Sequence, residues 1–317
     1  MPVATDTHDA MKEPIPFKIE SPPHRDVLRE DYDVKDLDAL SPEECARARV
    51  VVTSGFVGLS RGEIDRLPRL GMISCIGTGY ENVDLDAARE RGIVVSHGAG
   101  SNASGVADHA MAMLLAMMRN IPAFDASAKQ GLWRGTLAPR PMPGGKTLGI
   151  IGMGQIGERI ARRAAAFDME VLYHSRTPKP ELQWEYVPSV MALAERCDIL
   201  VMAAPGGRAT FRMIGADVLR ALGPSGFLVN IGRGPNVDTD ALVAALRSGG
   251  LAGAALDVFE TEPEIPASLR ELDNVLLTPH VAAFAPEMQT LGSQLLRKNI
   301  DAYFGSGRPV TPIPEMA

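Results

Sequence analysis

At roughly 150 residues per domain, the 317 residues of this chain indicate about two domains. Hydrophobic residues make up 45% and charged residues 22%, which is close to the globular average and excludes a disordered or fibrous chain. The net charge of −7 argues against a surface for nucleic acid or for an anionic membrane. We therefore expect a globular protein that binds neither.

Cysteine usage and targeting features indicate a compartment. Cys45, Cys75 and Cys197 are odd in number and form no C-x-x-C, so a disulfide framework is not expected. The first thirty residues lack the pattern of a signal peptide. The longest apolar run, 110–118, is far shorter than the roughly 20 residues of a membrane-spanning helix. The sequence predicts a soluble cytoplasmic protein.

The first part of the chain alternates strand and helix patterns. Residues 1–16 have no apolar period and predict a loose leader. Strands are expected at 50–56, 72–77 and 93–98, and helices at 60–70 and 83–92. This alternation predicts a parallel α/β sheet.

The middle of the chain differs from both flanks. Residues 106–120 predict a helix that is apolar on most of its surface, and so buried between domains or in a subunit contact. Residues 124–145 are polar and rich in Pro and Gly, which indicates an arm or linker.

The strand–helix pattern then restarts. Strands are expected at 146–152, 170–175, 198–205, 226–232, 253–259 and 274–279, with helices at 155–167 and 189–197. Sequential units of this kind predict a doubly wound fold. An amphipathic helix within 285–310 can return to pack on the first domain.

A glycine-rich loop indicates a nucleotide site. Residues 152–157 match G-x-G-x-x-G between an expected strand and an expected helix. Gly152 permits the tight turn, Gly154 lets a pyrophosphate approach the backbone, and Gly157 lets the helix pack on the sheet. Free N–H groups at the helix start then face the phosphates. The alternative is a plain strand–helix turn, and the complete context favours the nucleotide.

The end of the next strand indicates which nucleotide binds. An NAD site has Asp or Glu there to accept hydrogen bonds from the ribose hydroxyls. This chain has Ser175, Arg176 and Thr177 instead, with Lys179 nearby. Hydroxyl donors and a guanidinium suit a 2′-phosphate, so the sequence predicts NADP, with NADPH preferred over NADH. The alternative is an exposed arginine in a polar turn.

Three charged groups follow expected strand ends, where open α/β sheets bind ligands. Arg233 follows 226–232, Glu262 follows 253–259, and His280 follows 274–279. Arginine can clamp a carboxylate, histidine can transfer a proton near neutral pH, and a carboxylate beside the histidine stabilises the imidazolium. Singly, each could be a phosphate ligand, a turn residue or a loop cap. Together, behind the glycine loop, they predict an active site.

The motifs in this order resemble the D-isomer-specific 2-hydroxyacid dehydrogenase family. They are GTGYENVDLDAARERGIVV, VADHAMAMLLAMMR, the glycine loop, NIGRGPNVD, GAALDVFETEP and LLTPHVA, and the resemblance covers about residues 50 to 300. It is greatest to the NADPH-dependent glyoxylate/hydroxypyruvate and hydroxyphenylpyruvate reductases. Two departures are the first 16 residues and the Val-Ala-Ala after His280, where many members have glycines.

The resemblance implies roles for individual residues. Arg233 would clamp the substrate, His280 would be the general acid/base and Glu262 its partner. Backbone groups of Thr78 and Gly79 would hold the substrate carboxylate. The implied cofactor-binding residues, among which Asp257 would hold the nicotinamide carboxamide, are Gly152, Gly154, Gln155, Ile156, Gly157, Ser175, Arg176, Thr177, Ala204, Pro205, Ile231, Gly232, Arg233 and Asp257.

The resemblance also implies an architecture and a reaction. We expect a flavodoxin-like substrate domain (1–99 plus 286–317) and a Rossmann domain with a dimerisation arm (100–285), with the active site in a cleft between them. The protein would be a homodimer, and Trp133 of the arm could cover a neighbouring subunit's cleft. The reaction would be hydride transfer that reduces a 2-oxo acid to a D-2-hydroxy acid, without a metal.

Other interpretations stay open. A corepressor-like protein that senses nucleotide shares this fold and would not turn over glyoxylate or hydroxypyruvate. A formate-dehydrogenase-like enzyme would have Gln where this chain has Glu262. His97 and His109 are too far apart for an i, i+4 metal pair, so structural roles are expected, and Cys75 is expected to pack. The substrate pocket is expected to include residues 54–57 and 283–284.

Overall fold

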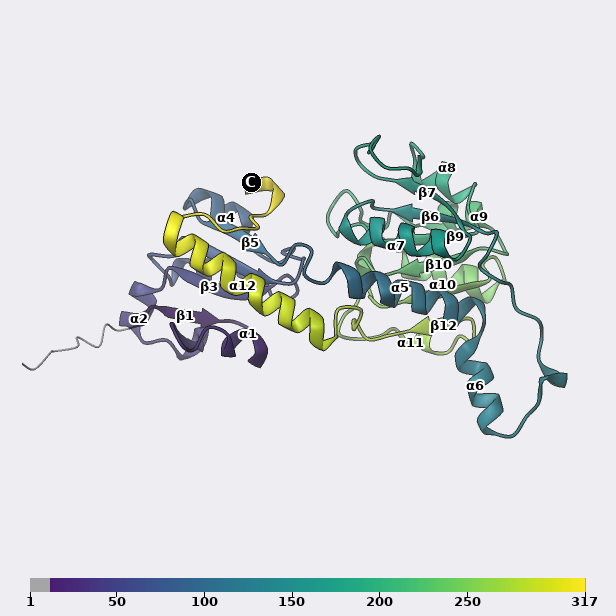
Figure 1. Cartoon of the computed structure of the whole chain (residues 1–317), viewed down its shortest axis with the longest axis horizontal. Coiled ribbons are helices and arrows are strands. Elements are labelled where there is room, and N and C mark those ends of the chain that lie inside the picture. Colours follow the sequence, from purple (N-terminus) through teal and green to yellow (C-terminus); the bar gives the residue numbers. More distant parts are fainter. Residues whose placement is uncertain (1–11, 317) are drawn as a thin grey trace, which may run out of the picture. The chain divides into compact units, whose positions relative to one another are not determined.

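The computed structural model describes residues 12–316. The chain divides into two compact units, each built around one sheet. The first unit runs to Asn102 and resumes at Ala285, and the second unit is Ala103–Phe284. Both sheets are parallel throughout, and helices cover them (Figure 1). The prediction of two parallel α/β domains is thereby confirmed.

The sheet of the first unit has the strand order β2-β1-β3-β4-β5. This is the flavodoxin-like order, which reverses beside the strand that starts the chain. The strands are β1 (Pro14–Phe17), β2 (Asp33–Asp36), β3 (Val50–Ser54), β4 (Met72–Ile76) and β5 (Val94–His97). The last three match the apolar runs seen in the sequence, because a parallel strand is covered on both faces.

The helices of the first unit are mostly short. They are α1 (Pro22–Asp26), α2 (Pro42–Arg47), α3 (Arg61–Asp65), α4 (Leu85–Glu90) and the long α12 (Pro286–Ser306). Ser41 and Ser60 start α2 and α3 with capping boxes, in which serine and the glutamate three residues on satisfy each other's backbone N–H groups. The helix α12 packs on α1 and β4 through Leu296 and Ile300, so the chain end closes the core of this unit.

The expected leader is wrong at its end, because Pro14–Phe17 is strand β1. The backbone of Glu13 accepts a bond from Asp33 of β2, and the backbone of Lys18 donates to Val52 of β3. Pro14 and Pro16 therefore face β3, whose pairing with β1 begins only at Phe17. The proline nitrogens, which cannot donate a hydrogen bond, therefore lie where β1 and β3 are not yet paired. Residues 1–11 of the leader lie outside the described residues.

The sheet of the second unit has the strand order β12-β11-β10-β9-β6-β7-β8. Its strands are β6 (Thr147–Ile151), β7 (Glu170–His174), β8 (Glu185–Tyr186), β9 (Ile199–Met202), β10 (Phe227–Asn230), β11 (Gly253–Leu256) and β12 (Val275–Leu277). Apart from the short β8, all lie within the expected ranges. The order reverses between β6 and β9, and this switch point is where doubly wound sheets bind nucleotides.

The helices of the second unit cover both faces of its sheet. They are α5 (Ala103–Met118), α6 (Ile121–Lys129), α7 (Gln155–Ala166), α8 (Val190–Ala194), α9 (Ala216–Leu222), α10 (Thr239–Arg247) and α11 (Ala267–Arg270). The apolar helix α5 packs against α7 and strands β10, β11 and β12 of its own unit. It is thus buried in one domain core, where the sequence suggested a domain or subunit boundary.

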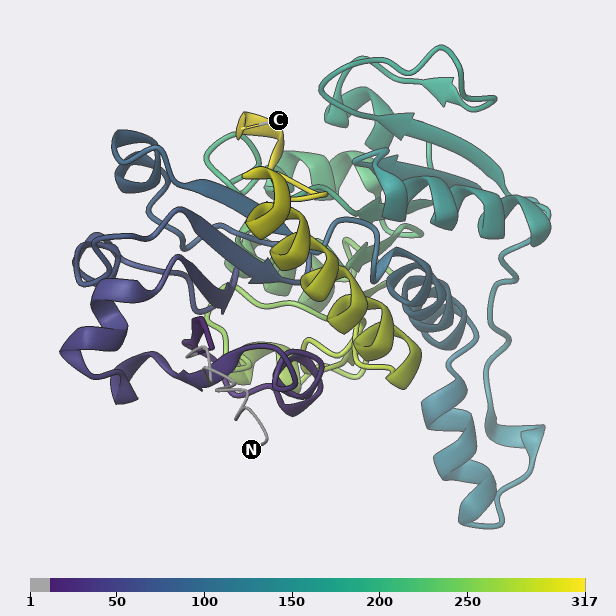
Figure 2. The same cartoon turned by 60° about the vertical axis from the view of Figure 1, so that its left-hand side comes forward.

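Helix α6 and the chain that follows it extend away from the sheet of their unit in both views (Figures 1 and 2). The sequence predicted an arm over 124–145, and the structure makes its start helical. Ile121, Leu132, Trp133 and Met142 are more than half exposed here, with Trp133 at 83%. Between residues 12 and 316, no helix has the length and apolar character that a membrane crossing requires.

Candidate functional site

The three charged residues of the predicted active site follow adjacent strands. Arg233, Glu262 and His280 lie in the loops after β10, β11 and β12, which are neighbours in the sheet. Because parallel strands end at the same edge, the three loops meet there. The structure thus collects these side chains on the second unit.

His280 and Glu262 form a hydrogen-bonded pair. The Nδ1–H of His280 donates to Oε2 of Glu262 at 2.8 Å, and the backbone N–H of Phe259 donates to Oε1 at 2.9 Å. Glu262 is mostly buried, whereas the His280 side chain is 42% exposed. Within the described residues Nε2 of His280 makes no hydrogen bond, so this ring atom can meet a ligand.

The pair shifts the pKa of both members. The hydrogen bond that His280 donates to Glu262 raises the pKa of His280, against burial and the positive charge of Arg233, which lower it. Burial works to raise the pKa of Glu262, but the bonds from His280 and Phe259 outweigh it and lower that pKa. An imidazolium with its negative partner is therefore favoured, and it can deliver a proton from Nε2.

The loop that carries Arg233 is held from both sides. The buried Asn230 accepts a bond from Gly232 N–H at 3.1 Å and donates to the carbonyl of Arg233 at 3.0 Å. Asn236 donates to the carbonyl of Ala204 at 3.1 Å. The motif containing these asparagines was recognised, but their own function was not anticipated, since amides beside a charged residue give no separate signal.

Gly234 sets the distance between two of these loops. A Cβ at this position would lie 1.9 Å from the backbone carbon of Phe259 and 2.4 Å from the backbone nitrogen of Glu260. No side chain fits in that space. Because Gly234 has none, the Arg233 loop can touch the segment that leads to Glu262.

Asp257 ties down the loop after β12. Its buried carboxylate accepts bonds from Thr278 Oγ1 at 2.6 Å, Val281 N–H at 2.9 Å and Ala282 N–H at 3.0 Å. Its backbone carbonyl accepts from the N–H of His280, whose φ of 52° is in the left-handed region. The carboxylate expected to hold a nicotinamide thus also fixes the backbone that presents His280.

The glycine loop fits a dinucleotide. Gly152 has φ of 98°, and a Cβ there would lie 2.6 Å from the backbone nitrogen of Ala204. A Cβ on Gly157 would lie 2.1 Å from the carbonyl of Gly152, so the helix packs closely on the strand. Around Gly154 the corresponding space is open, and Gln155 and Ile156 begin α7 directly after it. This open space before a helix start suits a phosphate.

Three further residues that were predicted to bind the cofactor lie at the same edge. Ala204 and Pro205 follow β9, which borders the switch point, and Ile231 follows the neighbouring strand β10. A Cβ on Gly232 would lie 2.6 Å from the carbonyl of Ala204, which shows how closely the two loops approach.

The turn after β7 is anchored at its ends and open in the middle. His174 Nδ1 bonds the carbonyl of Val187 at 2.9 Å, and the Tyr173 hydroxyl accepts from the N–H of Lys179 at 2.8 Å. The Ser175 hydroxyl donates to the carbonyl of Thr177 at 2.7 Å. Arg176 is exposed, and within residues 12–316 its guanidinium has no hydrogen-bond or ionic partner.

The two predicted substrate residues of the first unit lie in the loop after β4. His97 Nδ1 bonds the carbonyl of Thr78 at 2.9 Å, and Gly79 touches Gly55 so closely that a Cβ on Gly55 would lie 2.3 Å away. Within the described part of this unit, the N–H groups of Thr78 and Gly79 make no hydrogen bond. Phe56, in the neighbouring loop of the expected pocket wall, is 57% exposed.

The remaining candidates have structural contacts. His97 holds Thr78, and His109 Nε2 bonds Thr278 Oγ1 at 3.1 Å and lies 3.5 Å from the Asp257 carboxylate. Cys75 is buried, which raises its pKa to about 12 and makes it unreactive.

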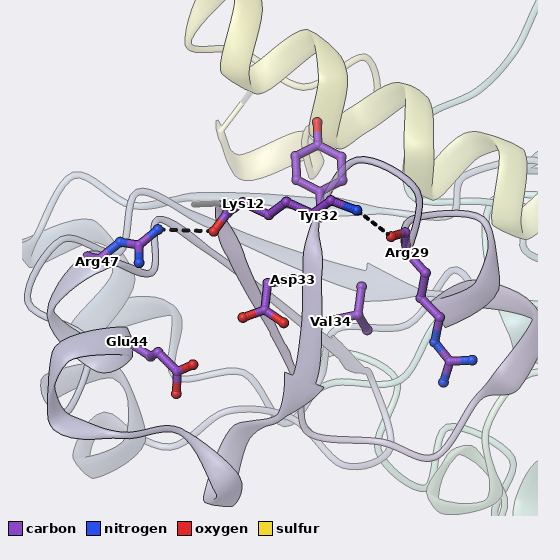
Figure 3. A pocket seen from close by; sticks show the side chains of 7 residues that line it. All are labelled: Lys12, Arg29, Tyr32, Asp33, Val34, Glu44 and Arg47. Atoms are coloured by element: carbon purple, nitrogen blue, oxygen red, sulfur yellow. Dashed lines mark hydrogen bonds between the residues drawn. The ribbon is translucent and has the colours of Figure 1, made fainter. Parts of the chain in front are cut away.

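The first unit has a pocket of about 490 Å³ away from all of these residues (Figure 3). Its walls mix both charges, and Lys12 crosses it to the carbonyl of Arg29. The lining residues are Lys12, Arg29, Tyr32, Asp33, Val34, Glu44 and Arg47. None of them belongs to a motif described above.

Comparison with known proteins identifies the family. Residues 111–282, more than half of the chain, match the family model for the D-isomer specific 2-hydroxyacid dehydrogenase, NAD binding domain. The chain belongs to this family. As a member of the D-2-hydroxyacid dehydrogenases, it is an NAD(P)-dependent oxidoreductase.

Relatives of this dehydrogenase have names that differ in substrate. Hydroxyphenylpyruvate reductase of Plectranthus scutellarioides is 41% identical over 88% of both chains. The 2-ketogluconate reductase of Gluconobacter oxydans is 40% identical over 84% of this chain and 86% of that protein. The structure of an NADPH-dependent glyoxylate/hydroxypyruvate reductase from Sinorhizobium meliloti, with NADP and malonate, gives a TM-score of 0.87 at 36% identity and covers 96% of each chain.

These comparisons confirm the family and the two-domain α/β fold predicted from the sequence. The relatives are reductases, which does not favour the corepressor-like alternative. Glu262, in its hydrogen bond to His280, stands against the formate-dehydrogenase-like alternative, in which Gln would occupy that position.

Proposed function

We propose that this dehydrogenase reduces a small 2-oxo acid to the D-2-hydroxy acid with NADPH. The substrate belongs to the glyoxylate, hydroxypyruvate or hydroxyphenylpyruvate class. The observation that carries the proposal is the 2.8 Å contact between His280 and Glu262 at the sheet edge that also presents Arg233. A proton donor beside a carboxylate clamp is what reduction of a 2-oxo acid needs.

His280 is the general acid. Glu262 holds the Nδ1–H, so the imidazolium presents Nε2–H to the carbonyl oxygen of the substrate. When the substrate oxygen takes this proton, the imidazole ring becomes neutral, and its hydrogen bond to Glu262 keeps the ring in the same orientation. In the reverse direction the neutral ring accepts the proton at Nε2.

Arg233 orients the substrate and stabilises the charge that develops on its oxygen. A guanidinium can bond a carboxylate through two parallel N–H groups and still attract a neighbouring oxygen. With these donors the reaction requires no metal.

The glycine loop and the turn after β7 hold the cofactor, which supplies the hydride when bound. The helix start beyond Gly154 would hold the pyrophosphate, and Ala204, Pro205, Ile231 and Gly232 would hold the nicotinamide half. Arg176 would pair with the 2′-phosphate, for which its guanidinium is available, since it is exposed and has no partner within the described residues. Ser175 has a bond within its own turn and contributes less.

We further propose a cytoplasmic homodimer. Helix α6 and residues 130–142 carry the exposed apolar side chains that a partner subunit would cover, Trp133 foremost. Cys45, Cys75 and Cys197 are free thiols, as suits a reducing compartment. Sedimentation of the wild type against Trp133→Ser tests the assembly, and a monomeric wild type would contradict it.

A substrate panel tests the proposed activity. Glyoxylate, hydroxypyruvate, hydroxyphenylpyruvate and 2-ketogluconate are each assayed with NADPH and with NADH, and the chirality of the product is determined for every substrate except glyoxylate, whose product is achiral. At least one of the first three should be reduced faster with NADPH, and the product of hydroxypyruvate or hydroxyphenylpyruvate should be the D-isomer. No turnover of any 2-oxo acid, or an L-product, would refute the proposal.

A further inference from the structure

Arg212, in the loop between β9 and α9, bridges the two neighbouring loops that carry Arg233 and Glu262. Its Nε and Nη2 atoms donate to Oε1 of Glu260 at 3.1 and 3.0 Å. Its Nη1 atom lies 3.4 Å from Oδ2 of Asp238, beyond the other loop. One guanidinium thus joins three loops that leave the sheet from different strands.

The backbone around Arg212 is fixed to the same loop. Its N–H donates to the carbonyl of Pro235 at 2.7 Å, and Ile214 N–H donates to the carbonyl of Asn236 at 3.0 Å. The φ of Arg212 is 47°, in the left-handed region that a side chain disfavours. The hydrogen bonds on either side hold this conformation and aim the guanidinium across the Gly234 contact.

Glu260 is the point at which this bridge meets the catalytic segment. Its backbone nitrogen would lie 2.4 Å from a Cβ on Gly234, and Glu262 is only two residues farther along. The backbone contact at Gly234 brings the two loops together, but a contact between backbones does not prevent them from sliding. The bonds from Arg212 to Glu260 on one side and Asp238 on the other supply that restraint.

We propose that Arg212 is a positioning residue, which clamps the Glu260–Glu262 segment to the loop of Arg233 and so holds Glu262 in contact with His280. The proposal rests on the proposed function, because it assigns Arg212 to the same site. The proposed role of Arg212 is to fix the geometry of the site and not to stabilise the fold. Arg212 is 43% exposed, and exposed ion pairs add little to the free energy of folding.

The direction in which the pKa of His280 changes distinguishes a positioning role of Arg212 from a purely electrostatic one. The charged groups facing His280 are Glu262, Arg233 and Asp257, and His109 of α5 faces Asp257 from the other side. Removing a nearby cation would raise the pKa of His280 through space. Loosening Glu262 would lower that pKa, because the hydrogen bond that His280 donates to Glu262 is what raises it.

The test uses a charge-neutral pair of changes in the full chain. In Arg212→Met with Glu260→Gln, one cation and one anion are lost together, so the direct electrostatic effects largely cancel. The matched control is Arg196→Met with Glu185→Gln, another exposed pair in the second unit, joined at 2.7 and 3.0 Å. The single change Arg212→Lys keeps the charge but loses the fork of donors.

The first readout is the pKa of His280, from NMR titration of its imidazole, assigned with His280→Asn. The second is kcat and KM for the 2-oxo acid across pH. The double variant should lower the pKa of His280, move the alkaline limb of reduction to lower pH and reduce kcat by about 5- to 50-fold, as expected for a misplaced catalytic group. Arg212→Lys should give a pKa of His280 and a kcat between those of the double variant and the wild type. The control pair should match the wild type in both.

A His280 pKa that stays unchanged or rises in the double variant would overturn the proposal, as would equal losses in the control pair. A midpoint of thermal unfolding within about 3 °C of the wild type would exclude general destabilisation as the cause. If the wild type reduces no 2-oxo acid, the proposed function fails, while the titration still decides whether Arg212 holds Glu262.

Discussion

Two regions at the same edge of the second sheet differ in how their charged side chains are held. In the loops after β10, β11 and β12, each loop is fastened to another by side chains, as by Asn236, Asp257 and Arg212. In the turn after β7, the backbone is anchored but Arg176 extends into solvent without a partner in the described chain. Under the proposed function, the catalytic side chains are fixed by contacts between loops, whereas cofactor choice would depend on a single unrestrained side chain and would be easier to change.

The largest effect is expected in the restrained region, at His280. His280→Asn should reduce kcat by about 10²–10⁴-fold, the usual loss for a general acid, while NADPH affinity stays unchanged. Asn is preferred to Ala because it tolerates the positive φ at this position, so the loop keeps its form. Steady-state kinetics and NADPH titration measure both quantities, and near-normal turnover would remove His280 from the mechanism.

Arg233 should show the next largest effect. Arg233→Lys keeps a positive charge but loses the paired donors that fit a carboxylate. A charge-assisted hydrogen bond contributes about 1.5–3 kcal/mol, so kcat/KM for the 2-oxo acid should fall by about 10- to 100-fold. If NADPH binding is lost instead, Arg233 is a phosphate ligand and the assignment to the substrate is wrong.

The unrestrained turn should permit a change of cofactor without loss of fold. Ser175→Asp with Arg176→Ile provides a ribose acceptor and removes the cation, so a preference for NADPH of about 10- to 100-fold in kcat/KM should reverse. Lys179→Met is the control, because it removes a nearby charge that lies at the anchored end of the turn. A wild type that uses NADH and NADPH equally would show that Arg176 is only a surface side chain.

The smallest effect is a shift along the pH axis. Glu262→Gln removes the negative charge of the hydrogen-bond acceptor that raises the pKa of His280, while burial and Arg233 still lower it. Reduction needs the imidazolium, so activity should be lost at a lower pH than in the wild type. The pH profile of kcat/KM measures this, and an alkaline limb that stays in place or moves upward would contradict the pairing.

The sequence predicts the restrained region well because strand ends in a parallel sheet converge. Arg233, Glu262 and His280 each follow an apolar run, and no knowledge of loop shape is needed to bring them to one edge. The same reasoning finds the glycine loop, since Gly152 and Gly157 are demanded by backbone contacts that any side chain would block.

The features that the sequence could not predict depend on which neighbouring strand a backbone nitrogen faces, and on contacts between residues that are far apart in the chain. Pro14 and Pro16 suggest irregular structure, and only the pairing of β1 shows that their nitrogens face β3 ahead of Phe17, where the pairing of these two strands begins. Arg212 lies 48 residues before Glu260 and in a turn of positive φ, so no local pattern marks it. Asn236 stands inside a recognised motif, but its bond to the carbonyl of Ala204 in another loop depends on three-dimensional proximity.

The buried carboxylate of Asp257 has a consequence for the motions of the loop beside it. Amides in exposed loops open to solvent more readily than amides in strands. The amides of Val281 and Ala282, however, donate to a carboxylate that lies beneath the surface. We therefore expect their hydrogen exchange to require an opening of the sheet edge, so that the loop that presents His280 exchanges as slowly as the strands.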